Sequence, residues 1–370
     1  MRCLLLSAYH AQSHAAWADG LMAALPEVDW TLLTLPPRHF SWRLRGNSLS
    51  WALLARDTLE ADYDVLLATS MTDLSALRGL CPALCRLPTA VYFHENQFAY
   101  PGSDHQRQSV EPQMLNLYTA LAADRVVFNS NYNRDSFIAG ADALLAKLPD
   151  YSPRTQVMAA LAGSQVLPVA IAPPSQAVQR LTGERLSLLW NHRWEYDKGP
   201  EQLLVILRAC DDAGLPLDVH VVGQQFRQHP EAFAQIEQLL TESRRLRKGQ
   251  WGYVEDAAAY RQLLASADVV LSTALHDFQG LSVMEAVAAG CRPLLPARLC
   301  YPQWFADDYL YPSSPTSPER EGRAVAAILK QWQQQKQQAA LTAPSLSSLY
   351  WSSLAPKYRQ LLAELAELRR

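Results

Sequence analysis

The sequence predicts an α/β fold of two doubly wound domains, in which parallel sheets are covered by helices on both faces. Short apolar runs alternate with amphipathic stretches along the chain, a pattern typical of strands buried on both sides. The chain has 370 residues, of which 49% are hydrophobic, and such a length is usually divided between two cores of about 150–200 residues each. Two Rossmann-like domains are therefore expected, facing one another across a ligand cleft at the carboxyl ends of their strands.

The first half of the chain is predicted to form five strands separated by helices. Leucine, valine and aromatic residues dominate the apolar runs, and the stretches between them repeat apolar residues at helical spacing. The expected strands lie at residues 3–9, 30–35, 64–70, 89–95 and 125–130, and the expected helices at 17–25, 48–60 and 111–121.

Three prolines at residues 167–176 interrupt this alternation and predict the linker between the domains, because proline suits neither a helix interior nor a central strand. The alternation then restarts, with strands expected at 186–192, 217–223, 249–254 and 268–273 and helices at 200–213, 230–245, 257–265 and 282–289. We therefore expect domains at 1–175 and 176–345, followed by a C-terminal helix at 346–370 whose return to the first domain stays open.

The composition excludes several classes of protein. A net charge of −3 argues against a protein that holds nucleic acid by bulk charge, although it is compatible with a local basic stretch. The six cysteines show neither a CxxC pair nor zinc-like spacing, so buried, reduced thiols are expected. The N-terminal apolar run is too short for a signal peptide, and no run approaches the roughly 20 apolar residues of a membrane span. A cytoplasmic protein without a membrane partner is expected.

The segment NHRWEYDKGPE (191–201) follows a predicted strand and carries two cations, Arg193 and Lys198. Cations beside a helix N-terminus suit a diphosphate, because the free N–H groups and the helix dipole add to their charge. Such a cradle would stabilise a leaving nucleoside diphosphate. Two solvated surface cations are the alternative interpretation.

The segment HDFQGLSVMEAVAAG (276–290) carries two carboxylates, Asp277 and Glu285, on either side of Gly280. Paired carboxylates can bind sugar hydroxyls, and the following helix offers N–H donors. A capping aspartate and an ordinary helical glutamate would explain the same pattern.

The segment VYFHENQFAYP (91–101) places His94, Glu95 and Asn96 at the end of a predicted strand. A single histidine is more often structural than catalytic, but polar neighbours at a strand end favour a site. The sequence has no glycine-rich dinucleotide fingerprint and no P-loop, which argues against an NAD-dependent oxidoreductase.

The segment LPPRHFSWRLRGN (35–47) alternates basic and aromatic residues. Cations among aromatic rings suit RNA phosphates and unstacked bases, and an exposed loop with anchoring aromatics is the equally plain alternative. The cations are Arg38, Arg43 and Arg45, and the aromatic residues are His39, Phe40 and Trp42.

Taken together, these segments resemble the retaining GT-B glycosyltransferases of family 4. The resemblance rests on R-x4-K at Arg193 and Lys198, on the acidic x7-E pair at Asp277 and Glu285, and on the GxxxxEAxAxG helix. The segments FHENQFAYP, WNHRWEYDKGPE and CxPLLPxxLxYPxxF are similar to a narrower group, the tRNA-queuosine α-mannosyltransferases of bacterial type, from Ser7 to about Phe305.

That resemblance implies a GT-B fold and a reaction. Mannose would pass from GDP-mannose to the cyclopentenediol of queuosine at the wobble position of tRNA-Asp, with retention of the anomeric configuration. The N-terminal domain would bind the acceptor tRNA and the C-terminal domain the nucleotide sugar. No cofactor or divalent metal is expected, since Arg193 and Lys198 would neutralise the diphosphate.

The resemblance also implies roles for single residues. Arg193 and Lys198 would bind the diphosphate, Glu285 the donor ribose, and Asp277 the hydroxyls of the donor sugar, while His94 would orient that sugar. The donor would further contact Gly223, Gly252, Tyr253, Val254, Gly280 and Leu281. The acceptor tRNA would contact Ser13, His14, Arg38, Trp42, Arg43, Arg45, Glu95 and Asn96.

Two departures from the family pattern leave sugar preference and acceptor open. Asp277 stands where glutamate is usual, which shortens the side chain by one methylene. Ala11 and Gln12 stand where two glycines usually precede Ser-His, and their side chains restrict close approach to the backbone. Oligomeric state is not readable from the sequence.

Two other functions remain compatible with the sequence. A glycosyltransferase of the same fold could act on a lipid-linked or small acceptor, for which the basic run at 244–248 is the only signal, with little apolar face. A non-catalytic nucleotide-sugar or RNA-binding module is the second, and the complete set of Arg193, Lys198 and Glu285 argues against it.

Overall fold

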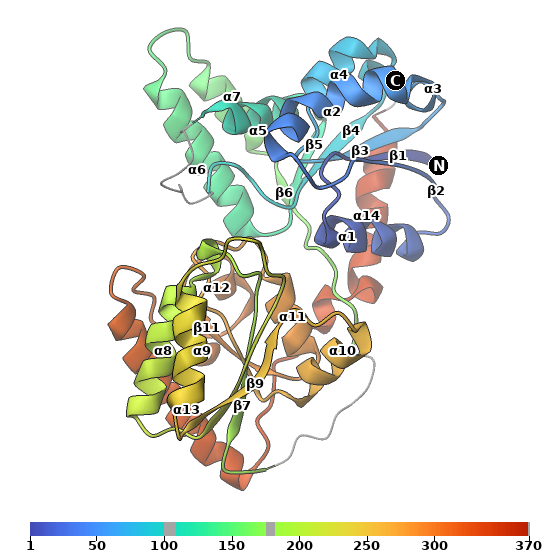
Figure 1. Cartoon of the computed structure of the whole chain (residues 1–370). Coiled ribbons are helices and arrows are strands. Elements are labelled where there is room, and N and C mark those ends of the chain that lie inside the picture. Colours follow the sequence, from blue (N-terminus) through green and yellow to red (C-terminus); the bar gives the residue numbers. More distant parts are fainter. Residues whose placement is uncertain (100–108, 175–181, 369–370) are drawn as a thin grey trace. The chain divides into compact units, whose positions relative to one another are not determined.

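The computed structural model describes residues 1–99, 109–174 and 182–368 (Figure 1). The expected domain boundary at 175/176 and residues 100–101 of the FHENQFAYP segment lie outside them. The chain divides into two compact units, which we call unit 1 (Met1–Ala170 with Leu349–Arg370) and unit 2 (Ile171–Ser348). The last segment of the chain therefore belongs to the same unit as the first.

Unit 1 contains a six-stranded parallel sheet in the order β2-β1-β3-β4-β5-β6. Its central strands are buried on both faces, which explains their continuous apolar runs. The first connection runs to one side of β1 and all later ones to the other, so a switch point lies between β1 and β3. The strands are β1 (Arg2–Ser7), β2 (Asp29–Thr34), β3 (Val65–Thr69), β4 (Thr89–Phe93), β5 (Arg125–Phe128) and β6 (Gln165–Val166).

Helices cover both faces of this sheet. Alternation along β4 sends Val91 and Phe93 toward the core that contains Phe128 and Phe137, and sends Tyr92 to the opposite face, where it stacks on Trp17. The helices of unit 1 are α1 (Gln12–Ala24), α2 (Phe40–Leu54), α3 (Arg56–Leu59), α4 (Leu74–Leu80), η1 (Pro82–Arg86), α5 (Glu111–Leu121), α6 (Asn131–Lys147), α7 (Arg154–Leu161) and α14 (Trp351–Ala366).

Helix α14 is held on unit 1 by Tyr358. The hydroxyl of this buried residue accepts a hydrogen bond from Trp17 Nε1 at 3.0 Å and lies 3.1 Å from the hydroxyl of Tyr92 and 2.9 Å from the carbonyl oxygen of Pro168. A buried tyrosine of this kind joins apolar packing to a satisfied polar tip. The C-terminal helix is thus part of the core of unit 1.

Unit 2 contains a second six-stranded parallel sheet, in the order β12-β11-β10-β7-β8-β9. Connections from β7 run first to one side and then, from β10 onward, to the other, so the switch point lies between β7 and β10. The strands are β7 (Leu186–Asn191), β8 (Leu217–Val222), β9 (Leu246–Gly252), β10 (Val269–Leu271), β11 (Arg292–Pro296) and β12 (Leu310–Tyr311).

The core of unit 2 lies where amphipathic helices pack on this sheet, with Leu203, Phe233 and Leu329 among the buried side chains. The helices are η2 (Tyr196–Lys198), α8 (Pro200–Asp212), α9 (Ala232–Glu242), α10 (Ala257–Ser266), α11 (Leu281–Ala288), α12 (Tyr301–Trp304), η3 (Asp307–Tyr309), α13 (Pro318–Gln338) and η4 (Ser347–Leu349). The predicted α/β class with two doubly wound parallel sheets is confirmed.

Three expectations were wrong in detail. The helix expected at 48–60 begins earlier, at Phe40 within the LPPRHFSWRLRGN segment, because Leu44 and Trp51 of that helix pack into the core. The ninth strand begins at Leu246 rather than at residue 249. Of the six thiols expected to be buried, that of Cys85 is exposed. Within the described residues, no helix combines the length and apolar character needed to cross a bilayer.

Candidate active site

The predicted donor residues of unit 2 gather at the carboxyl edge of its sheet, around the switch point between β7 and β10. Strand β7 pairs with β10 on one side and with β8 on the other, and β9 follows β8. The segments at 192–199, at 223, at 252–254 and at 272–280 leave these strands at the same edge. Open parallel sheets bind ligands at this position.

Lys198 is buried and held in place from three directions. Its Nζ donates a hydrogen bond to the carbonyl oxygen of His276 at 2.6 Å and lies 3.2 Å from Oδ2 of Asp197. Its own carbonyl oxygen accepts a hydrogen bond from Thr273 Oγ1 at 2.8 Å. The ammonium group is therefore fixed between the loops that follow β7 and β10. Lys198 is thus not the solvated surface cation of the alternative interpretation.

Asp197 is the buried counter-charge of this lysine, and sequence reasoning did not single it out. Burial alone would raise the pKa of Asp197, but its interactions with His276 and with the positive charge of Lys198 lower that pKa below its ordinary value. Its backbone carbonyl oxygen also accepts hydrogen bonds from the N–H groups of Leu275 and His276. A buried charge needs such a partner and such hydrogen bonds to remain ionised.

Asp277 follows β10 and turns the chain into helix α11. Its carboxylate accepts hydrogen bonds from the Gly280 N–H at 3.0 Å and from the Tyr301 hydroxyl at 3.1 Å. Burial would raise the pKa of Asp277, but Lys198 and the nearby His192 lower it below its ordinary value. Asp277 thus caps the turn and stays ionised, and its oxygens keep lone pairs for further donors.

His192 lies at the centre of these charges. Burial lowers the pKa of its imidazole to about 4, and the charges of Asp277, Lys198, Asp197 and Arg193 act on it with opposing signs. Arg193, Lys198 and Asp277 therefore all lie close enough to act on the charge of one buried, neutral histidine. Arg193 itself is half exposed and forms an ion pair with Glu195 at 2.9 Å.

Glu285 lies further along the same edge, on helix α11, and its side chain is exposed. The pKa of Tyr260 is raised by burial and, beyond that, by the negative charge of Glu285. Asn191, the last residue of β7, donates hydrogen bonds to the Tyr260 hydroxyl at 3.2 Å and to the Ser282 carbonyl oxygen at 2.8 Å. Glu285 is thus positioned beside the β7 end, and Leu281 begins the helix that carries it.

Gly223 lets the segments after β7 and β8 pack against each other. A Cβ atom at Gly223 would lie 1.8 Å from the carbonyl oxygen of His192, and the residue has a φ of 149°. Its N–H donates to the carbonyl oxygen of Gly252 at 3.3 Å, which joins the β9 end to the same edge. Beyond Gly252, Tyr253 is 54% exposed and Val254 is half-buried.

In unit 1, His94 directly follows strand β4 and lies inside an aromatic cluster. Its ring centroid lies 4.2 Å from that of His14 and 4.7 Å from those of Trp17 and Tyr92. Burial, and then the neighbouring His14, hold the pKa of His94 well below its ordinary value, so the ring is neutral near pH 7. His14 Nδ1 lies 2.7 Å from the Tyr9 carbonyl oxygen, which can only accept, so Nδ1 carries the proton.

The other residues expected on the acceptor side differ in their surroundings. Ser13 is exposed in the first turn of α1, and Glu95 is half-buried. Asn96 was expected to face the acceptor, but it is fully buried and occupied: its Nδ2 donates to Asn133 and Ser136, and its Oδ1 accepts from the next residues of the chain. Asn96 therefore holds the loop after β4 and is not available to a ligand.

The three arginines expected to contact the tRNA do not share one exposed surface. Arg38 is exposed before α2, but Arg43 is 8% exposed and faces the core. Arg45 forms ion pairs with Asp73 and Glu111, each at 2.9 Å. The cause is the helix, since its period of 3.6 residues turns neighbouring positions toward different surroundings, which an extended loop would not do. Trp42 is 53% exposed on the same helix.

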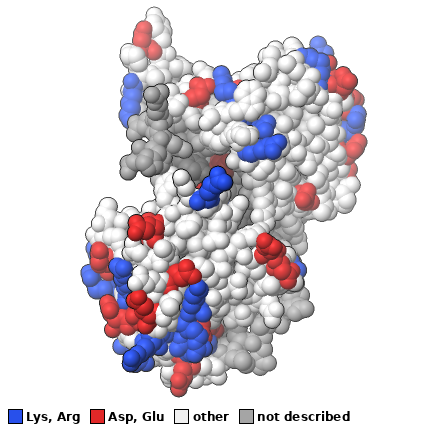
Figure 2. Space-filling view, viewed as in Figure 1, with Lys and Arg blue, Asp and Glu red and all other residues white. Residues whose placement is uncertain are grey.

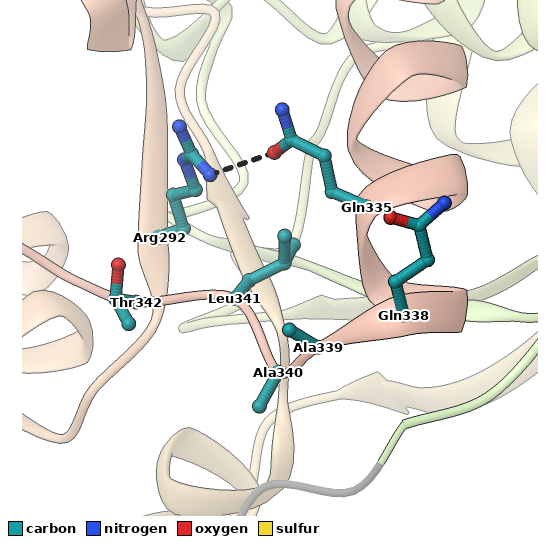
Figure 3. A pocket seen from close by; sticks show the side chains of 7 residues that line it. All are labelled: Arg292, Gln335, Gln338, Ala339, Ala340, Leu341 and Thr342. Atoms are coloured by element: carbon teal, nitrogen blue, oxygen red, sulfur yellow. Dashed lines mark hydrogen bonds between the residues drawn. The ribbon is translucent and has the colours of Figure 1, made fainter.

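A pocket of unit 2 lies away from all these residues (Figure 3). It is lined by Arg292 at the amino end of β11, by the end of α13 and by the segment that follows it. The guanidinium of Arg292 lies 4.3 Å from the ring centroid of Trp332 and donates to Gln335 Oε1 at 3.1 Å. Within the described residues, no group of three or more His, Cys, Asp or Glu side chains is placed to hold a metal ion.

Comparison with known proteins gives a family match. Residues 2–171 match the family model described as the N-terminal part of tRNA-queuosine alpha-mannosyltransferase. A Drosophila melanogaster protein named tRNA-queuosine alpha-mannosyltransferase is 30% identical over 322 residues, which are 84% of this chain and 83% of that protein.

Solved structures share the fold at low sequence identity. The Anabaena protein HepE in complex with UDP-glucose has a TM-score of 0.65 at 15% identity, and the match covers 98% of this chain and all of that one. A UDP-forming trehalose-phosphate synthase from Burkholderia xenovorans has a TM-score of 0.65 at 13% identity and covers 100% and 99% of the two chains. The predicted GT-B fold is confirmed.

Proposed function

Because the chain belongs to the tRNA-queuosine alpha-mannosyltransferase family and is therefore a glycosyltransferase, we propose that it transfers mannose from GDP-mannose to queuosine. The acceptor is the cyclopentenediol of that nucleoside at the wobble position of tRNA-Asp, and the tRNA partner favours a cytoplasmic location. The observation that carries the donor half of this proposal is the fixed charge pattern around His192 in unit 2.

Lys198 and Arg193 bind the diphosphate of the donor in this proposal. Lys198 is immobilised by Asp197 and by the His276 carbonyl oxygen, so its charge needs no reorganisation when a ligand arrives. The first N–H groups of α8 and α11 lack partners within their helices and add positive potential at the same edge. Charge that develops on the departing diphosphate is stabilised there.

The carboxylates orient the rest of the donor. Asp277 is ionised and accepts from hydroxyls of the sugar, and Glu285, exposed beside the β7 end, accepts from the ribose. The neutral ring of His94 orients the sugar at the reacting carbon. Asp277 stands in place of the usual glutamate and is shorter by one methylene, so the choice of donor sugar is the property that this departure is most expected to affect.

The reaction proceeds with retention. The bond between the anomeric carbon and the diphosphate oxygen breaks, and the acceptor hydroxyl attacks from the same face. The proton of that hydroxyl passes to the departing phosphate oxygen, and the products are the mannosylated nucleoside and GDP. The cations of the site stabilise this departure without a divalent metal, and no carboxylate has to act as nucleophile in this course, unlike in retaining glycosidases.

The test uses purified protein, radiolabelled GDP-mannose and two tRNA pools, one with queuosine and one without. Label in the queuosine-containing pool alone is the expected result, and equal labelling of both pools would reject queuosine as the acceptor. If neither pool takes label while GDP still binds, the acceptor assignment fails and the donor assignment stands.

A lipid-linked or small acceptor is not supported by the basic run at 244–248. Part of that run lies in strand β9 and not on an amphipathic helix, and Arg247 lies 3.6 Å from Asp218, while Lys248 pairs with Glu237. Arg247 and Lys248 are thus partnered within unit 2 and do not form the basic face of an amphipathic membrane-surface helix.

A further inference from the structure

Trp42 lies flat against its own helix. A Cβ atom at Gly46 would be 2.5 Å from Cε2 of Trp42, 2.6 Å from Cζ2 and 2.7 Å from Cδ2. Cε2 is a ring-fusion carbon with three bonded neighbours in the ring plane, so an atom can approach it this closely only from above the ring. One face of the indole therefore covers Gly46, and any side chain at that position would occupy the same space.

The opposite face of this indole is open. With one face against the helix, an exposed fraction of 53% requires that the other face meets solvent. A large, half-exposed aromatic ring held in a fixed plane is costly to leave in water and is well suited to stack on a planar ligand.

Helix α2 is anchored so that this ring has a fixed position. Asn47 is fully buried, and its Nδ2 donates to the carbonyl oxygens of Arg43, Leu44 and Met71, while its Oδ1 accepts from the Asp73 N–H. Arg45 adds its two ion pairs from the same helix. The ring plane of Trp42 is thus preorganised, which lowers the entropy cost of stacking.

The start of α2 also lies at the strand-end edge that carries His94. Phe40 makes an edge contact with Tyr9, with ring centroids 5.9 Å apart, and the Tyr9 carbonyl oxygen lies 2.7 Å from His14 Nδ1. The His14 ring in turn contacts that of His94. A base stacked on Trp42 would therefore be bound at the edge of unit 1 where the acceptor nucleoside is proposed to react.

The net charge of −3 argues against attraction of RNA by bulk charge and favours a local contact such as stacking. On the face of the molecule drawn in Figure 2, Lys and Arg side chains form small separate groups with Asp and Glu among them, not a continuous basic surface. Arg38, which precedes α2 in the same segment as Trp42, is exposed, and the first turn of α2 contains no acidic residue. An exposed cation in the same segment as an exposed aromatic face suits a single-stranded nucleotide, whose phosphate and base are bound together.

We propose that the exposed indole face of Trp42, seated on Gly46, is a stacking platform for an unpaired base of the tRNA anticodon loop, with Arg38 on the adjoining phosphate. This inference rests on the proposed function, because that function places the modified nucleoside in the loop. It goes further in naming the surface that receives the RNA and Gly46 as the residue that orients it.

The experiment measures the Kd of queuosine-containing tRNA, together with kcat and KM for that tRNA and the Kd of GDP. Trp42→Ala should weaken tRNA binding roughly 5- to 150-fold, the range that loss of one stacked base produces. Trp42→Tyr keeps an aromatic face and should recover most of the affinity. KM for tRNA should rise with Kd, and GDP binding should stay unchanged.

Gly46→Ala is the sharper variant. Alanine favours a helix over glycine, so α2 should not be weakened intrinsically, yet the methyl group displaces the indole from its seat and should weaken tRNA binding. Leu53→Ala, at a position of the same helix that is 67% exposed, is the matched control and should bind like the parent. Thermal unfolding of each variant separates loss of the platform from loss of the fold.

Salt dependence separates the ring from the charge. Trp42→Ala should weaken binding by the same factor at low and high salt, whereas Arg38→Ala should lower the slope of log Kd against log salt by about 1. Parent-like tRNA affinity in Trp42→Ala would overturn the platform even if labelled mannose still reaches queuosine. If the unsubstituted protein binds tRNA through Trp42 but transfers no sugar, the proposed reaction is rejected and the stacking platform stands. If the unsubstituted protein binds no tRNA, the stacking platform is overturned.

Discussion

The two units share one architecture but carry different chemistry at the same edge of their sheets. Each has six parallel strands with one switch point. At that edge unit 2 places ionised groups in compensating pairs, as with Lys198 and Asp197, whereas unit 1 places the neutral His94 among the rings of His14, Trp17 and Tyr92. Charges bind and stabilise a diphosphate, while neutral polar and aromatic groups suit a sugar or a base. The fold positions a site, and the side chains at the strand ends decide what it binds.

The strongest test of this contrast is to remove the central cation of unit 2. Lys198→Ala should lower kcat by about 10²–10³-fold, the usual effect of losing one preorganised group that stabilises developing charge. Because the buried carboxylate of Asp197 then loses its positive partner, the melting temperature should fall as well. Steady-state kinetics measure the effect, and far-UV circular dichroism shows that the variant is folded. Lys248→Ala removes a surface lysine as control, and near-normal turnover in Lys198→Ala would contradict the assignment.

Acid should destabilise the chain through its buried histidines. The pKa of His192 is about 4 in the folded chain because burial penalises the charged form, against 6.5 for an ordinary histidine. Between these values the unfolded chain binds a proton that the folded chain does not, so stability present above pH 6.5 is lost as pH falls toward 4. His94, with its lowered pKa, acts in the same direction in unit 1.

At pH 4.5 the share of His192 alone should be about 2–3 kcal/mol of unfolding free energy relative to pH 7.5. Urea unfolding followed by tryptophan fluorescence at several pH values measures it. His192→Gln should show a shallower loss between pH 6.5 and 4, and an unchanged slope in this variant would mean that His192 is not buried in its neutral form.

In unit 1 the hydroxyl of Tyr358 is the group to remove. Tyr358→Phe keeps the packing of α14 but leaves Trp17 Nε1 and the Pro168 carbonyl oxygen without the hydrogen bonds they now make to this hydroxyl. Unfolding free energy should fall by about 1–3 kcal/mol, as measured by urea unfolding. Tyr151→Phe, at a site 96% exposed, should be neutral; an equally neutral Tyr358→Phe would show that α14 is held by packing alone.

The smallest expected effect is none. If Lys198 and Arg193 do the work that a divalent ion does in other transferases, EDTA should leave the rate of mannose transfer unchanged. The measurement compares initial rates with and without EDTA at constant ionic strength. Loss of activity that magnesium or manganese restores would place a metal in the donor site. It would contradict the assignment of diphosphate stabilisation to the cations of unit 2 alone.

The fold was predictable because continuous apolar runs report burial on both faces of a sheet. The short strands β6 and β12 escaped notice, since strands of two residues carry no periodic signal. Arg193, Lys198, Asp277 and Glu285 could be found from their positions after strands and from the family pattern. Asp197 lies in the segment 191–201 together with Arg193 and Lys198 and was missed, because its importance comes from its contact with His276, far along the chain.

The arginines of α2 show the opposite error. Their spacing suggested one basic surface, but the helix was expected only from residue 48, so the helical period that buries Arg43 and directs Arg45 to Asp73 was not applied to them. The indole of Trp42 was visible in the sequence as an aromatic residue among cations. Its seat on Gly46 was not, because only the structure shows which ring face is covered.

The hydrogen bonds of Tyr358 also have a consequence for synthesis on the ribosome. When residue 348 has been translated, every residue of unit 2 has been made, but unit 1 still lacks Leu349–Arg370. Trp17 and Tyr92, made early, must wait for a partner that is added 341 and 266 positions later. The usual order, in which the N-terminal part of a nascent chain is completed first, therefore does not hold: unit 1 contains the first residues to be made but is completed only by the last helix.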